Sequence, residues 1–549
     1  MSKNSERVSY FVKVTHIYNC MRKLLKAVFI ITGFTMIDRI LGFGFKIYLA
    51  RQLGEVNFGI YQVALSTFFV LLTFTTSGIP LIVSKLTAIS KKNNDRKTEG
   101  ALVAAALVSG VGVSLVICAI FILFQAPIGG IFATAESMNL LLLMLPALIF
   151  SGVYAAFRGN MWGRRRYVTV SVIELIEQVT RIALVILFAL MGFNLLRITA
   201  ISMSVALGVT ALCTAAAFFK DKGKLQNPKA QFKPLLKQAV PVTFIRASNT
   251  LVGGLLSIVV PFLLTRTGLS TTESLAVFGA SVGMAMPLLF LPLTVVGSLA
   301  YVLIPSLSAS YAAGDKKSVQ TQIESAIAFS VVVASFFIPI FFALGEPIGL
   351  FVYGNASSGR FLSISAWLLI PIALESIVSS MMNSINLEKQ SFFNYLIGAA
   401  LMFGMMFATG SHFRIEFLSF GLGLAWTLSS ILDIIAIKKR TGIKIGTFLV
   451  PLIKCVALII PAAFITRGLY SLLTALPIVL RIMLPSIASL SFFGGLSLVF
   501  GVLDLSLIFK GSKKRTHSVA QNRVDKKRAK LAKSVKNKQA VVQVRVRNS

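Results

Sequence analysis

Charged residues are scarce in this 549-residue chain, at 13% of the total, and acids are the scarcest, with 19 Asp and Glu. A water-soluble protein usually carries about 25% charged residues, because its surface has to be hydrated. With 56% hydrophobic residues and a mean hydropathy of +0.82, the composition excludes a soluble enzyme and a free nucleic-acid-binding protein. It predicts an integral membrane protein.

Cysteine and histidine are also rare, with four and three residues. The cysteines lie far apart and form no CxxC pair, which argues against a disulfide framework, an iron–sulfur site or a zinc site. The chain also lacks the GxxxxGK[ST] loop of an ATP-driven motor. We therefore expect no catalytic residues, no metal, no bound cofactor and no enzyme activity.

Long apolar runs are what the chain has in abundance. About 20 apolar residues are needed to span a bilayer. Fourteen runs reach that length, at about 27–49, 61–84, 101–125, 139–161, 167–190, 195–219, 239–264, 275–309, 323–345, 362–385, 392–411, 417–437, 447–467 and 477–508. The eighth and last runs are overlong and contain Pro or Gly, so breaks are expected there. The pattern predicts an all-α polytopic membrane protein with about 14 transmembrane helices.

Lysine and arginine are distributed unevenly between these runs. If the N-terminus is cytoplasmic, 42 of the 54 basic residues fall on the inner side and 7 on the outer side. Without the basic C-terminal tail the ratio is still 28 to 7. Because Lys and Arg accumulate in cytoplasmic loops, we expect both termini in the cytoplasm.

Short sequence words recur at a fixed distance along the chain. Ala126-Pro127-Ile128-Gly129 returns as Glu346-Pro347-Ile348-Gly349, and Asp95-Arg96-Lys97 returns as Asp315-Lys316-Lys317, both 220 residues later. The two copies lie six helices apart, so they would have the same orientation in the membrane. This predicts two pseudo-symmetric six-helix lobes, plus two extra C-terminal helices, as in secondary transporters with parallel repeats.

The repeat and the charge runs divide the chain into six parts. These are a cytoplasmic N-tail at 1–26, an N-lobe at 27–219, a basic cytoplasmic linker at 220–238, a C-lobe at 239–437, two further spans at 438–509 and a basic tail at 510–549. The tail holds 14 Lys and Arg, so we expect a disordered segment drawn to anionic inner-leaflet lipids. A nucleic-acid partner is not expected, because no aromatic residues alternate with these charges.

Several charged side chains fall inside the apolar runs, where each costs several kcal/mol unless it meets water or a partner. Arg39 and Lys46 are seven residues apart and share one helical face, while Asp38 lies about 100° away from Arg39. Glu177 and Arg181 have the spacing of an intrahelical ion pair.

These charges and a polar stripe in the seventh run predict a shared water-filled cavity. Its expected substrate-binding residues are Arg39, Lys46, Arg181, Arg246 and Asn249. Three acids are candidates for ion pairing or for coupling to a cation, namely Asp38, Glu177 and Glu375.

Several motifs resemble those of a known family. Arg39-Ile40-Leu41-Gly42-Phe43, with Gly59-x-Tyr61-Gln62 after it, resembles the first-helix signature of lipid-linked oligosaccharide flippases in the multidrug/oligosaccharidyl-lipid/polysaccharide exporter superfamily. Ser77-Gly78-Ile79-Pro80, Arg158-Gly159 and Ile176-Glu177-Gln178 resemble more narrowly the stage V sporulation protein B branch, which is similar to the MurJ lipid II flippases. The resemblance covers about residues 24–510.

This resemblance implies a fourteen-helix, two-lobe flippase with a central cationic cavity. Arg39 matches the family's central arginine and Arg181 matches its motif. The chain departs from the pattern at Phe45-Lys46, where the family has an Arg-Asp pair, so Lys46 would supply the charge one residue later.

The expected substrate is an undecaprenyl-pyrophosphate-linked saccharide, with lipid II for peptidoglycan synthesis as the first choice. It would cross the bacterial cytoplasmic membrane by alternating access, driven by Na⁺, H⁺ or the membrane potential. Cell-wall synthesis proteins are further candidate partners. The alternatives are export of other lipid-linked polysaccharide units, a multidrug or cation antiporter, which would need anionic or aromatic cavity faces, and a membrane glycosyltransferase, for which no loop is large enough.

Overall fold

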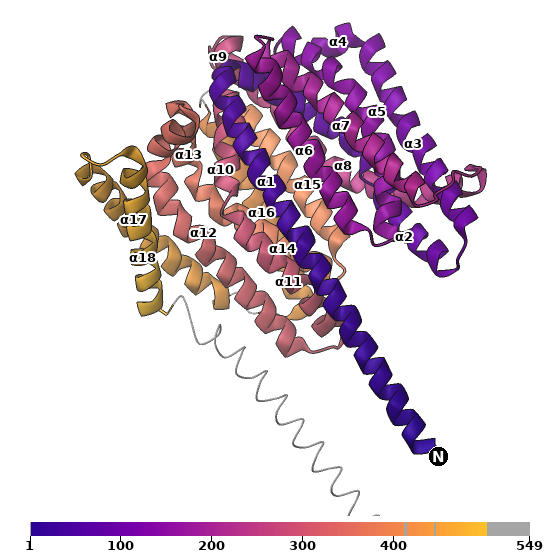
Figure 1. The fold of residues 1–549 in the computed structure, drawn as a ribbon. Coiled ribbons are helices and arrows are strands. Elements are labelled where there is room, and N and C mark those ends of the chain that lie inside the picture. The colour runs from indigo at the N-terminus through magenta and orange to yellow at the C-terminus, as the bar shows by residue number, and fades with distance from the viewer. Residues whose placement is uncertain (1, 411–412, 414, 444–445, 502–549) are drawn as a thin grey trace, which may run out of the picture.

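The computed structural model describes residues 2–410, 413, 415–443 and 446–501, and every regular element in these ranges is a helix (Figure 1). The N-terminal half contains α1 (Ser2–Thr76), α2 (Ile79–Lys92), α3 (Arg96–Leu123), α4 (Gln125–Gly129), α5 (Ala135–Gly163), α6 (Tyr167–Leu190) and α7 (Leu195–Lys220). The C-terminal half contains α8 (Lys229–Arg266), α9 (Thr271–Phe278), the π-helix η1 (Gly279–Ala285), α10 (Met286–Phe290), α11 (Leu293–Ala312), α12 (Lys316–Tyr353), α13 (Ala356–Ser365), the 3-10 helix η2 (Ala366–Leu368), α14 (Leu369–Ser384), α15 (Glu388–Thr409) and α16 (Glu416–Thr441). The last two helices are α17 (Gly446–Leu472) and α18 (Ile478–Val499). The predicted all-α polytopic class is confirmed.

Thirteen helical stretches in the described residues are long and apolar enough to cross a membrane. One of them, Gly33–Lys92, has 60 residues, or about 90 Å at 1.5 Å per residue, and bends within α1. Thr271–Phe290 and Leu293–Ala312 are separated only by Leu291 and Pro292. α6 is 24 residues long but carries three charges. The count is roughly consistent with the expected fourteen.

The long helix α1 runs along the molecule and then turns back. The reversal is at Gly54, whose φ of 71° and ψ of 174° lie outside the helical region. A positive φ is strained for residues with a Cβ atom, so glycine suits this position. The returning chain leads into α2, and Lys91 Nζ in its last turn donates to the Arg164 carbonyl at 3.3 Å.

The molecule therefore has two ends. We call the end that holds the turns at 93–95, 164–166, 221–228 and 313–315 the basic end, and α1 enters the bundle from this side (Figure 1). The opposite end, where α4 and α9 lie, is called the far end (Figure 1).

The repeated sequence motifs have matching local structures. Asp95 accepts from the Thr98 backbone N–H at 2.9 Å and caps the start of α3. Asp315 accepts from the Ser318 N–H at 3.0 Å and caps the start of α12 in the same way. Such caps satisfy backbone donors that the first helical turn leaves free. The copies differ at their far ends, because α3 stops at Leu123 whereas α12 continues through Pro347 to Tyr353.

Three expectations about the C-terminal half can be compared with the observed helices. The break predicted in the eighth run is present, as η1 followed by the interruption at Leu291 and Pro292. The second half of the expected linker at 220–238 forms the first turns of α8, which begins at Lys229. α17 and α18 pack on α12 and flank the C-terminal half (Figure 1). The expected tail at 510–549 lies outside the described residues.

Gly59→Ala should destabilise the fold. A Cβ atom at Gly59 would lie 2.0 Å from the Leu275 carbonyl oxygen, and this backbone cannot move aside without shifting a helix. Overpacking of this kind costs about 1–3 kcal/mol, so the Tm of the detergent-purified protein should fall. The control is Gly44→Ala in the same helix, where no atom lies within 4 Å of the added Cβ atom. Equal Tm values for the two variants would contradict the contact.

Candidate substrate cavity

A cavity of about 380 Å³ lies within the N-terminal half, among α1, α2, α5, α6 and α7. Its charged lining residues are Asp38, Arg158, Glu174, Glu177 and Arg181. The lining also includes the polar side chains of Thr76, Ser151, Tyr154 and Gln178. Two cations and three acids thus meet inside a bundle of apolar helices, where charged groups require water or partners.

α6 contributes four lining residues from one face, as the helical period predicts. The expected ion pair between Glu177 and Arg181 is not among the described ion pairs. The Thr210 hydroxyl of α7 donates to Glu177 Oε2 at 3.3 Å, whereas Arg181 donates to Gln178 Oε1 and lies 5.7 Å from the centre of the Phe45 ring. The spacing allows a contact along the helix, but the described hydrogen bonds of the two side chains go to Thr210 on α7 and to Gln178 on α6 itself.

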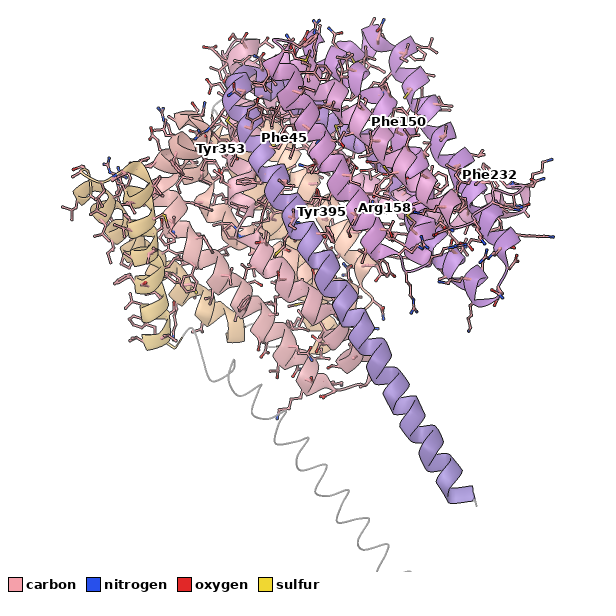
Figure 2. The ribbon with its side chains drawn as sticks, viewed as in Figure 1. Phe45, Phe150, Arg158, Phe232, Tyr353 and Tyr395 are labelled. Atoms are coloured by element: carbon pink, nitrogen blue, oxygen red, sulfur yellow. The ribbon has the colours of Figure 1, made fainter. Side chains whose placement is uncertain are left out.

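Arg158, which is labelled in Figure 2, lines the cavity from α5. Its guanidinium forms an ion pair with Glu174 at 2.8 Å, and the Tyr154 hydroxyl donates to the same carboxylate oxygen at 2.8 Å. The guanidinium also lies over the Trp162 ring, 4.3 Å from its centre. Its Nε is buried and has no hydrogen-bond partner. Arg158 is thus held by three side chains and still has a donor to offer.

Arg158 was not among the substrate-binding residues predicted from the sequence, although Arg158-Gly159 belongs to one of the family motifs. In the sequence, Arg158 lies close to the arginine-rich turn at 164–166, and basic residues are common near such turns. The structure extends α5 to Gly163, which places Arg158 more than one turn inside the helix. Trp162 four residues later was an available signal, because residues i and i+4 face each other on a helix.

α1 brings a different face to the cavity from the one expected. Asp38 lines the cavity, and a Cβ atom at Gly42 would lie 3.3 Å from Gln178 Nε2, so this face meets α6. Arg39 is exposed and lies outside the lining. Lys46 is half-buried and takes part in none of the described hydrogen bonds or ion pairs. The structure therefore does not bring Arg39 and Lys46 together with Arg181 in this cavity.

A second cavity, of about 510 Å³, adjoins the first and holds Arg246. The two cavities share Arg158 and three other lining residues, which are Leu72, Thr76 and Pro80. Thr250 on α8 lines the second cavity and is in hydrogen-bond distance of Thr73 on α1, at 3.2 Å. A path of polar residues thus runs from Arg181 past Arg158 to Arg246. The side chain of Asn249 lies outside the described residues.

Glu375 lies in the C-terminal half, away from the other predicted acids. It is on α14 and accepts from the Ser430 hydroxyl at 3.3 Å. Asp433 on α16 is fully buried and accepts from Ser391 and from Asn394, each at 2.7 Å. The structure thus separates Glu375 from Asp38 and Glu177.

At the far end the two halves are held together by polar contacts. Arg51 Nε donates to the Val352 carbonyl at 2.7 Å, and a second Arg51 nitrogen donates to the Phe351 carbonyl. Asn355 Nδ2 donates to Glu55 Oε2 at 2.6 Å. These contacts join the reversal of α1 to the end of α12 and the start of α13. The far end is closed, and the cavities are nearer the basic end, where α5 ends and α6 begins.

The sequence matches one protein family and is similar to several bacterial proteins. The polysaccharide biosynthesis protein family matches residues 24–311, just over half of the chain. Stage V sporulation protein B of Bacillus subtilis (strain 168) is 27% identical over 400 residues, which cover 70% of this chain and 77% of that protein. Lipid II flippase MurJ of the same organism is 22% identical over 473 residues, which cover 76% of this chain and 83% of that protein.

Solved structures show the same fold. Lipid II flippase MurJ in an inward closed conformation aligns with a TM-score of 0.67 at 15% identity, covering 86% of this chain and 98% of that chain. An inward-facing multidrug resistance MATE family transporter of the MOP superfamily aligns with a TM-score of 0.64 at 13% identity, covering 76% and 98%. The resemblance inferred from the motifs is confirmed. The chain belongs to the polysaccharide biosynthesis protein family, and it has the multi-pass helical fold of MurJ.

Proposed function

We propose that the protein is a flippase that moves an undecaprenyl-pyrophosphate-linked saccharide from the inner to the outer leaflet of the bacterial cytoplasmic membrane. Lipid II is the proposed substrate, since a relative that aligns with 76% of this chain is named a lipid II flippase. The basic end would face the cytoplasm, because Lys and Arg accumulate in cytoplasmic loops. The protein would transport its substrate without catalysing a reaction.

The observation that supports this proposal is a pair of arginines with unused donors. Nε of Arg158 and Nε of Arg181 are both buried without a hydrogen-bond partner, and both side chains line the same cavity. A buried donor left unpaired costs about 1–3 kcal/mol, which a bound phosphate oxygen would recover. Arginine also presents its donors as a fork that matches phosphate oxygens. Arg246, at the end of the polar path, would contact the far side of the head group.

Arg39, Lys46 and Asn249 complete the proposed substrate site in another conformation of the transporter. Alternating access requires the two halves to rock about the bound substrate. In this structure the far end is closed by Arg51, Glu55 and their partners. Opening that end would move the first half of α1 against α6 and could turn the face of Arg39 and Lys46 toward the head group.

The membrane potential would supply the driving force. A pyrophosphate diester carries two negative charges, and moving each across 100 mV is worth about 2.3 kcal/mol. Cations that move with the substrate would cancel part of this energy. Asp38, Glu177 and Glu375 are the proposed sites at which Na⁺ or H⁺ could couple to transport.

Arg181→Gln should weaken binding of purified lipid II by about tenfold to a hundredfold. The substitution removes a charge-assisted contact worth about 1.5–3 kcal/mol and leaves no acid unpaired, because Arg181 is in none of the described ion pairs. Binding is measured in detergent by microscale thermophoresis, and flipping of labelled lipid II is measured in proteoliposomes with an imposed inside-negative potential. Arg39→Ala in the same assays tests whether the α1 face enters the site during transport.

The matched control is Arg197→Gln, which removes a cation whose side chain is 60% exposed and which faces Glu136 at 3.6 Å, outside both cavities. Binding and flipping should stay at the parent level in this variant. Equal losses in Arg181→Gln and Arg197→Gln would mean that only overall charge matters, and the cavity would not be the site.

Glu55→Ala should loosen the far end. It removes the acceptor of the 2.6 Å contact from Asn355, which joins the two halves. Spin labels at Asn57 and Ser357 should then show a broader and longer distance distribution by double electron–electron resonance. Arg360→Gln is the control at the same end, because its ion pair with Glu346 is exposed and such pairs contribute little. An unchanged distribution in Glu55→Ala would exclude this contact as a gate.

A cation antiporter is the second candidate function. Three acids line the first cavity beside Tyr154, and anionic or aromatic faces are what a cationic substrate requires. The same proteoliposomes distinguish the two functions. Export of ethidium against a Na⁺ or H⁺ gradient, together with no lipid II binding, would replace the flippase proposal with the antiporter.

A further inference from the structure

A third cavity, of about 470 Å³, lies at the basic end of the N-terminal half. It is formed by the start of α3, the end of α5 and the turn that follows α7. Its charged lining residues are Arg96, Lys97, Glu99, Arg164, Lys222 and Lys224. We call this cavity the basic pocket. It shares no lining residue with the two cavities described above.

The single acid of the basic pocket is already neutralised. The Glu99 side chain is 5% exposed, and its carboxylate accepts from Asn160 Nδ2 at 2.7 Å and from two nitrogens of Arg164, one of them at 2.9 Å. The hydrogen bond to Glu99 raises the pKa of Arg164, so this guanidinium stays charged. The side chains of the four remaining cations take part in none of the described hydrogen bonds or ion pairs. The lining therefore carries a net positive charge, with five cations and one acid.

The shape of the basic pocket is set by close backbone packing. A Cβ atom at Gly100 would lie 2.0 Å from the Lys224 carbonyl oxygen, so the turn after α7 rests directly on α3. Phe218 forms a buried apolar part of the lining. An ion pair between Arg166 and Asp221 ties the same turn to the one between α5 and α6. The cations are thus presented by elements that are fixed to each other.

Apolar side chains surround the turn that forms the pocket. Phe219 is 52% exposed and Leu225 is 42% exposed, directly beside Lys220, Lys222 and Lys224. Phe232, at the start of α8, lies at the outer edge of the N-terminal half (Figure 2). Exposed apolar residues next to Lys and Arg are typical of segments that lie at the boundary between lipid head groups and acyl chains.

We propose that the basic pocket binds the phosphate of an anionic phospholipid head group, with the acyl chains along Phe219 and Leu225. Free phosphate would offer the same charge, but it would not use the apolar side chains beside the pocket. Basic pockets between membrane helices are suited to such head groups. This inference does not depend on the proposed flippase function, because the pocket and the substrate cavity have no residue in common.

The internal repeat provides a matched control. Lys316 and Lys317 stand where Arg96 and Lys97 stand in the first copy, at the same end of the molecule. In the second copy Gln320 replaces Gly100 and donates to the Thr441 and Gly442 carbonyls, at 3.0 and 3.1 Å, so that helix packs on α16 and the turn after it. Removing these two lysines changes the net charge of the basic end without touching the basic pocket.

The experiment compares Lys222→Gln/Lys224→Gln with Lys316→Gln/Lys317→Gln in the full chain. Each protein is purified in detergent and titrated with dioleoylphosphatidylglycerol or dioleoylphosphatidylcholine, and bound lipid is counted by native mass spectrometry. Because each Lys near an anionic lipid surface contributes about fivefold to affinity, the pocket variant, which lacks two, should bind phosphatidylglycerol about thirtyfold more weakly. The control variant should bind phosphatidylglycerol as strongly as the parent protein does. Its binding of phosphatidylcholine should also equal that of the parent. Tm values of all three proteins verify folding.

Three results would overturn the proposal. Equal weakening in both variants would show a general effect of surface charge, and no weakening in the pocket variant would show that the pocket holds no lipid. Displacement of phosphatidylglycerol by 10 mM inorganic phosphate, with phosphate bound in a Lys222- and Lys224-dependent way, would assign the pocket to the free anion instead. Flipping of lipid II does not enter these readouts, so failure here and failure of the flippase proposal are separate outcomes.

Discussion

A charged side chain inside a membrane has to meet water, a counter-charge or a hydrogen-bond donor or acceptor, and the N-terminal half is arranged to meet this requirement. The ion pair between Arg158 and Glu174 joins α5 to α6, and Tyr154 adds a second donor to the same carboxylate. Glu177 is satisfied from α7 and Arg181 from its own helix. Helices that carry these groups cannot face lipid, so they enclose a polar cavity. The Nε atoms of Arg158 and Arg181 remain without a hydrogen-bond partner. They are the part of the site that can bind an anion.

The same requirement explains why the two halves meet where they do. Arg51 and Glu55 lie at the reversal of α1, and both find partners at the end of α12 and the start of α13. Close contacts between glycines and carbonyl groups, as at Gly59 and Gly279, allow the backbones to approach beside these polar contacts. The far end is therefore held by a few directional polar contacts together with fully buried apolar side chains, such as Phe58 and Leu275. Opening this end for alternating access would have to break both kinds of contact.

The basic end shows how one buried acid organises several cations. Glu99 holds Arg164 and Asn160 in place, and the turn after α7 packs on the first turn of α3. The repeat copy has Val319 at the position that corresponds to Glu99, and there the helix packs against α16 with no such acid. The two copies of the predicted repeat thus share a long helix with an aspartate cap, while their side chains at the basic end differ.

The sequence by itself determined the membrane class, the approximate number of spans and the family, because these depend on hydropathy and on short local motifs. It also selected α6 as a polar helix, since Glu174, Glu177 and Arg181 share a face whatever surrounds them. Only the tertiary structure decided which residues meet. It placed Asp38 but not Arg39 in the lining of the cavity, gave Glu177 and Arg181 different hydrogen-bond partners, and brought in Arg158 from α5. The physical reason is that a helical period gives the direction of a side chain about its own axis, whereas the rotation and neighbours of that helix are set by packing across the whole bundle.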